Sequence, residues 1–81
     1  MHVSAYRRLT GEVGRLARLA ATEATPDGRR GALASLRGLT AELQGAVCAG
    51  CSQADVQHAW STLERARTLL VASERPTEMQ P

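Results

Sequence analysis

The sequence predicts an all-α fold of three helices. Apolar residues recur at alternating spacings of three and four along most of the 81 residues, as on one face of an amphipathic helix. No stretch alternates apolar and polar residues as a half-buried strand does. The helical pattern is interrupted only near Pro26 and near Gly50. We therefore expect an N-terminal helix at about 4–23, followed by an antiparallel helical hairpin at about 26–49 and 52–74.

The first expected helix carries one apolar stripe. Its members recur at 3-4-3-4 spacing: Tyr6, Leu9, Val13, Leu16 and Ala20. Ser4 is placed to cap this helix. Gly11 and Gly14 lie inside it, and each costs about 1 kcal/mol relative to alanine. We therefore expect this helix to depend on docking against the others.

The second expected helix has clear signals at both ends. Thr25 suits the N-cap and Pro26 the first helical position. The stripe repeats the same spacing with Leu36, Leu39, Leu43, Ala46 and Gly50, and Leu33 and Val47 widen it. Gly50 suits a left-handed C-cap, which places Cys48 in the last turn and Cys51 in a two-residue joint.

The third expected helix follows directly. Ser52 suits its N-cap, and Asp55 lies in the positive first turn. Its stripe is Val56, Ala59, Leu63, Ala66 and Leu70. The residue before Pro76 disfavours the helical conformation, so we expect the helix to end there and residues 76–81 to form a frayed tail.

The composition indicates a single small domain over 1–81 with a thin core. The chain has no Phe, one Trp and one Tyr, and leucine and alanine supply most of the apolar set. Such a domain usually needs a stabilising cross-link or a binding partner to stay folded. No apolar run approaches the roughly 20 residues that span a bilayer, and the N-terminus lacks a signal-peptide apolar region. We therefore expect a cytoplasmic protein with reduced cysteines and no membrane partner.

The charge is uneven. The formal net charge is +2, all basic residues are arginine, and most of them lie in the first half. Arg7, Arg8, Arg15 and Arg18 fall on related sides of the first helix. They suit a solvated face, or weak phosphate contacts with a nucleic acid. We favour the solvated face, because only two aromatic residues are available for base stacking.

The two cysteines, spaced C-x-x-C, invite a chemical interpretation. With His58, Cys48 and Cys51 supply three zinc ligands, and the other histidine, His2, is at the far end of the chain. A thioredoxin-like site needs a βαβ context. We therefore expect a small buried apolar residue at Cys48, a loop thiol at Cys51, no metal and no cofactor. Ser52, Asp55 and His58 do not converge on one point from consecutive turns of one helix, so we expect no enzyme.

A protein-binding surface explains the apolar surplus better. Trp60, Leu69, Leu70 and Val71 spread over more than one stripe of the third helix. Apolar surface wider than a bundle can cover marks a partner site, and Trp60 is the best anchor. The predicted partner-binding residues are Trp60, Leu63, Leu70, Leu69, Leu36, Leu39, Leu43 and Leu16.

Residues 27–71 resemble the small YscE-type co-chaperones of type III secretion needles. The matching elements are Asp27-Gly28, Leu33-x-x-Leu36-x-x-Leu39-x-x-x-Leu43, Ala49-Gly50-Cys51-Ser52 and Leu63-Glu64-x-Ala66-x-x-x-Leu70. The resemblance implies a helical hairpin that pairs with a larger tetratricopeptide-type chaperone. Together they would hold the needle subunit soluble before export.

Two other functions fit the same residues. One is a small phage- or plasmid-encoded helical regulator that inhibits a host protein complex. The other is a zinc or redox module built on Cys48, Cys51 and His58. The heptad-like spacing fits a monomeric bundle and a homodimer equally well.

Overall fold

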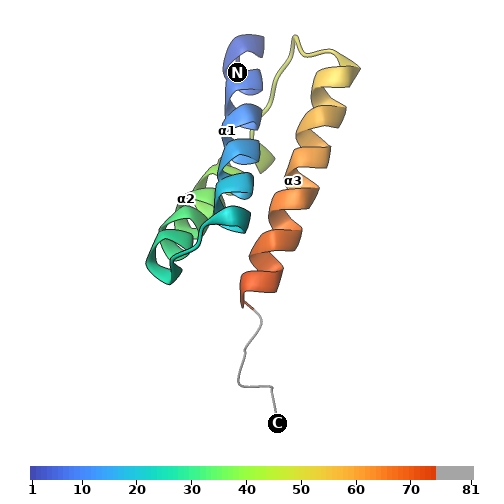
Figure 1. The fold of residues 1–81 in the computed structure, drawn as a ribbon. Helices are drawn as coiled ribbons and strands as arrows, with labels where there is room; N and C mark the ends of the chain where they lie inside the picture. The colour runs from blue at the N-terminus through green and yellow to red at the C-terminus, as the bar shows by residue number, and fades with distance from the viewer. Residues whose placement is uncertain (75–81) are drawn as a thin grey trace.

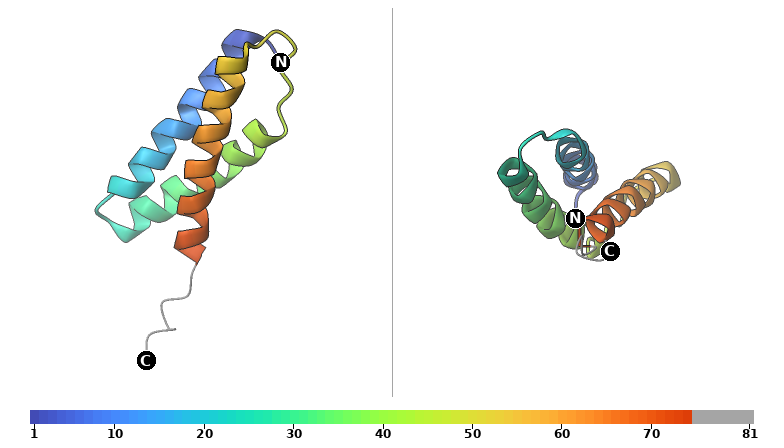
Figure 2. Two further views of the ribbon diagram at one scale, coloured as in Figure 1. Left: turned by 90° about the vertical axis from the view of Figure 1, so that its right-hand side faces the viewer. Right: turned by 60° about the horizontal axis from the view of Figure 1, so that its bottom comes forward.

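The computed structural model describes residues 1–74 and confirms the all-α fold. Three helices make up this part of the chain: α1 (Val3–Thr22), α2 (Pro26–Gln44) and α3 (Gln53–Glu74). They run down, up and down in Figure 1, so α2 runs in the opposite direction to both of its neighbours, and Figure 2 shows that it crosses α3 obliquely. All three pairs of helices are in contact. The tail predicted at 76–81 lies outside the described residues.

The start of each helix follows from local side-chain hydrogen bonds. At α2, the Gly28 N–H donates to Thr25 Oγ1 at 3.1 Å, and Pro26 occupies the first turn, as predicted. At α1 the prediction of Ser4 as N-cap is wrong. The helix begins one residue earlier, so His2 is the N-cap, and its Nδ1 accepts from the Ser4 N–H at 3.0 Å.

The start of α3 is capped by two reciprocal hydrogen bonds between Ser52 and Asp55. The Asp55 N–H donates to Ser52 Oγ, and the Ser52 N–H donates to Asp55 Oδ2, each at 3.2 Å. This is a capping box with aspartate in place of the usual glutamate. It confirms the capping roles that the sequence predicts for both residues.

The end of α2 differs from the prediction. The helix stops at Gln44 rather than at about 49, so residues 45–52 form an eight-residue connection instead of a tight joint. Gly45 is the C-cap with φ −89°, and no glycine in residues 1–74 has a positive φ. Cys48 therefore lies in the connection and not in a helix.

The connection packs against the start of α1, as Figure 2 shows. The N-terminal ammonium of Met1 donates to the Val47 carbonyl at 2.8 Å. A Cβ added to Gly50 would lie 3.3 Å from Val3 Cγ2, so the two segments approach closely there. These contacts explain the early end of α2: the chain leaves the helix to reach the α1 N-terminus before α3 begins.

The core lies between the three helices and is built from leucine, alanine and valine. Its best-buried large side chains are Val13, Leu36 and Leu43. Thr10 and Thr62 are also buried, and each hydroxyl donates to the carbonyl one turn earlier at 2.9 Å. The buried Thr40 hydroxyl has no such partner. Within residues 1–74, no helix combines the length and apolar character needed to cross a membrane.

Candidate functional site

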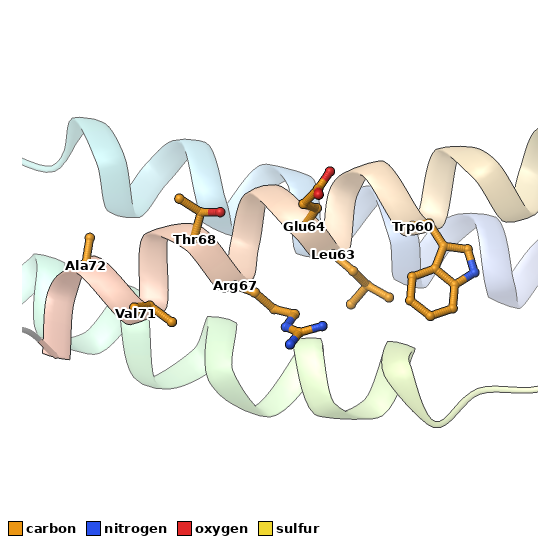
Figure 3. A pocket seen from close by; sticks show the side chains of 7 residues that line it. All are labelled: Trp60, Leu63, Glu64, Arg67, Thr68, Val71 and Ala72. Carbon is orange, nitrogen blue, oxygen red and sulfur yellow. The ribbon is translucent and has the colours of Figure 1, made fainter.

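A row of side chains on α3 faces water although part of it is strongly apolar. Trp60 is 58% exposed and Val71 is 61% exposed. Both line a shallow hollow of about 660 Å³ whose walls come from α3 alone. We call its lining the α3 face: Trp60, Leu63, Glu64, Arg67, Thr68, Val71 and Ala72. Leu63 is buried at the base of this face, and the other six lining residues are exposed (Figure 3).

The centre of the α3 face is a seam of four residues. Trp60, Glu64, Arg67 and Val71 follow one another at 4-3-4 spacing, which keeps them on one side of the helix. The seam is about 16 Å long at 1.5 Å per residue. Its two apolar members stand at the ends and its two charged members in the middle. The 4-3-4 spacing is that of the positions by which one helix packs lengthwise on another, and here the two central positions are charged.

The two central charges are available to a partner. In Figure 3, Glu64 and Arg67 lie on the two flanks of the seam, and their side chains point away from each other. In the part of the chain that the structure describes, neither side chain joins an ion pair; the pairs are Arg7–Asp55, Arg15–Glu12, Arg30–Asp27 and Arg37–Glu74. A partner that presents the complementary charges can therefore engage both residues without breaking an existing contact.

The structure divides the predicted partner-binding residues into two groups. Five of them are buried in the core of the chain: Leu16, Leu36, Leu43, Leu63 and Leu70. Leu39 and Leu69 are half-buried against that core. Trp60 alone is largely exposed. The leucine stripes thus hold the three helices together, and Trp60 is the predicted residue that a partner can reach directly.

The seam consists of Trp60 together with Val71, Glu64 and Arg67. Val71 is among the surplus apolar residues that the sequence predicts, whereas Glu64 and Arg67 were not predicted as partner-binding residues. Their signal was the spacing from Trp60: positions four, seven and eleven residues later lie on the same side of a helix. The side of α3 that faces α1 is set by the helix packing and not by this spacing.

A second hollow lies between α1 and α3. Its volume is about 720 Å³, and small side chains on both helices leave it open. Ala17 and Ala21 line it from α1, and Leu69 and Ala72 line it from α3. Glu64, Thr68 and Ala72 line both hollows, so the surface of the α3 face continues towards α1.

The cysteines depart from the prediction of reduced thiols. Cys48 and Cys51 are joined by a disulfide within the 45–52 connection, and both side chains are half-buried against the core. Their sulfurs are bonded to each other here, so they are not thiolate ligands for a metal. His58 is exposed on α3, as predicted.

The polar residues near the start of α3 serve the fold. Arg7 donates from Nε to Asp55 Oδ1 at 2.9 Å and from Nη2 to Asp55 Oδ2 at 3.2 Å, which ties α1 to α3. The hydrogen bond from Arg7 is the main cause that lowers the pKa of Asp55 to about 2, with Ser52 contributing. Ser52 Oγ donates to the same carboxylate at 3.0 Å. Both Ser52 and Asp55 are thereby engaged in capping and helix pairing.

The arginines of α1 are partly engaged in the same way. Arg7 pairs with Asp55, and Arg15 pairs with Glu12 at 2.7 Å, whereas Arg8 and Arg18 are exposed. Pairing with carboxylates lowers the net positive charge of this side of α1, which agrees with the interpretation of a solvated face.

No protein-family model, curated protein or solved structure matches this chain.

Proposed function

We propose that this chain is a non-catalytic helical adaptor that binds another protein through the α3 face. The exposure of Trp60 is the observation that carries the proposal, because an indole is large, apolar and costly to leave in water. Tryptophan is also the residue type most enriched among interface hot spots. Val71 provides a second apolar contact one seam length away.

The remaining residues of the face suit recognition. Glu64 and Arg67 lie between the two apolar contacts and supply charge that fixes the register of a bound helix. All seven lining residues belong to one continuous helix, so little backbone ordering is needed on binding. A partner helix laid along α3 would meet Trp60, Arg67 and Val71 in successive turns.

The finer form of the proposal is a cytoplasmic co-chaperone for a type III secretion needle subunit. It rests on the YscE-type resemblance, which implies a larger tetratricopeptide-type chaperone as a third component. The antiparallel arrangement of α2 and α3 supports the helical hairpin of that resemblance. An amphipathic needle helix would be kept from polymerising while its apolar side is covered.

Co-purification tests this function. The tagged full-length chain is expressed in its native host, and separately together with a needle subunit and a tetratricopeptide-type chaperone. A W60A/V71A variant removes both apolar contacts of the α3 face. The matched control is V47A, because Val47 is 76% exposed but lies in the connection between α2 and α3.

We expect the wild-type chain and V47A to retain the same partner, and W60A/V71A to lose it. Circular dichroism should show equal helix content in all three proteins, since the changed side chains are exposed. A partner retained equally by all three proteins would remove the α3 face from the function. A partner other than the needle subunit would overturn only the finer form.

A further inference from the structure

The seam on α3 is symmetric about its own midpoint. The midpoint lies between Arg65 and Ala66, and Trp60 and Val71 are equally far from it in opposite directions. Glu64 and Arg67 are likewise equidistant from it. Turning the helix end over end about this midpoint therefore places Val71 where Trp60 was, and Arg67 where Glu64 was.

Such a helix is complementary to itself in the antiparallel direction. When two copies of α3 lie antiparallel with their midpoints aligned, Trp60 meets the second copy's Val71, and Glu64 meets the second copy's Arg67. A two-fold axis repeats each contact, as a closed symmetric dimer requires. The 4-3-4 spacing places these residues in the alternating core layers of an antiparallel helix pair.

We infer that the α3 face binds a second copy of this chain, forming a two-fold dimer through antiparallel α3 helices. The inference rests on the proposed function, because it names the partner of the same face. Charge complementarity carries it: Glu64 and Arg67 have no ion pair within residues 1–74, and each finds the opposite charge on the second copy.

The charges also select direction and register. In a parallel pair, Glu64 would face the second copy's Glu64 and Arg67 its Arg67, and like charges opposed across an interface are unfavourable. A shift of one heptad in the antiparallel pair would bring Trp60 against Glu64. The arrangement that satisfies all four seam residues is therefore the midpoint-aligned antiparallel one.

The size of the face limits the strength of this dimer. The seam spans about 16 Å, or three helical turns. One such helix pair covers less than the roughly 800 Å² per partner of a standard stable interface. The dimer therefore dissociates on dilution, and a partner with a larger interface displaces the second copy from the same face.

Charge reversal provides the test. Sedimentation equilibrium of the full chain measures association for the wild type, E64R, R67E and E64R/R67E. Each single reversal places like charges against each other in both central layers of the dimer. We expect it to raise the dimer dissociation constant by at least about tenfold. The double reversal restores complementarity and wild-type affinity. An equimolar mixture of E64R and R67E forms a heterodimer, because one copy then carries two bases and the other two acids.

The matched control is E42R, which makes the same charge change on an exposed position of α2. We expect E42R to dimerise like the wild type. A wild-type chain that stays monomeric to millimolar concentration overturns the inference, and so does a mixture of E64R and R67E that stays monomeric.

The dimer and the adaptor function fail in different ways. If the chain stays monomeric but W60A/V71A still abolishes capture of another protein, the dimer is wrong and the adaptor function stands. If the chain dimerises with the charge pattern described but W60A/V71A captures the other protein as well as wild type does, the dimer stands and binding of that protein through the α3 face is wrong.

Discussion

Asp55 connects more of the chain than any other single carboxylate in residues 1–74. Its oxygens accept from Arg7 on α1 and from the backbone and hydroxyl of Ser52 at the start of α3. The sequence predicted the capping contacts, which are local. It did not predict Arg7, which lies 48 residues away and meets Asp55 only because α1 and α3 run side by side.

The titration of Asp55 follows from these contacts. Its pKa is lowered to about 2, below the value of about 3.9 for an unperturbed aspartate. The ionised form is therefore favoured by folding, and its contribution to stability is present above about pH 4 and is lost as the pH falls towards 2. We expect NMR titration to give a midpoint near 2 in the wild type and a higher midpoint in R7Q. A wild-type midpoint near 4 would contradict the Arg7–Asp55 pair.

Thr40 offers a second test at the residue scale. Its hydroxyl is buried without a hydrogen-bond partner, and such a group costs free energy that an apolar group of the same shape does not. We expect T40V to raise the free energy of unfolding by about 1 kcal/mol. T10V is the matched control, because the Thr10 hydroxyl donates to the Tyr6 carbonyl and its loss should give no gain. Chemical denaturation measures both, and equal effects would refute the distinction.

At the scale of elements, the starts of α2 and α3 were predictable, whereas the N-cap of α1 and the end of α2 were not. Thr25 and Ser52 cap the helices that follow them, since capping uses residues two or three positions apart. The predicted Gly50 cap failed because residues 45–52 pack on the start of α1, a contact between distant segments. The same contact takes Cys48 out of the expected last helical turn, and Cys48 and Cys51 form a disulfide within the connection.

The disulfide should contribute modestly to stability. It joins residues three apart in sequence, so it closes a very short loop and removes little entropy from the unfolded chain, worth about 2 kcal/mol in the chain-entropy model. We expect C48A/C51A to keep its three helices but to unfold at lower denaturant concentration. Adding a dithiol reductant to the wild-type protein should lower its free energy of unfolding by a similar amount. Wild-type stability unaffected by reductant would show that the bond is absent in solution or has no influence on folding.

At the scale of the whole molecule, the all-α architecture was predictable, but the binding surface was predictable only in part. The spacing of leucines identified three helices, because any helix that buries one side shows this pattern. The same pattern cannot separate leucines that bury one another within the chain from those left for a partner. Packing makes this division: Leu63 and Leu70 are buried, whereas Trp60 and Val71 on the same helix face water.

The thin core of this small chain leaves its one tryptophan exposed on α3. Leucines and alanines from the three helices form the core, whereas the largest side chain of the sequence, Trp60, lies outside the core. Covering Trp60, whether by a second copy or by another protein, is the event that links the structure to the proposed function.

Trp60 itself reports that event, because it is the only tryptophan in the chain. Its fluorescence should be recorded over a wide range of protein concentration, with E64R as a variant that keeps the indole but opposes like charges across the seam. We predict that wild-type emission moves to shorter wavelength and becomes less accessible to acrylamide as concentration rises, whereas E64R does not change. Emission that stays water-exposed at every concentration, and also in the presence of the co-purified partner, would contradict the claim that the α3 face is a protein-binding surface.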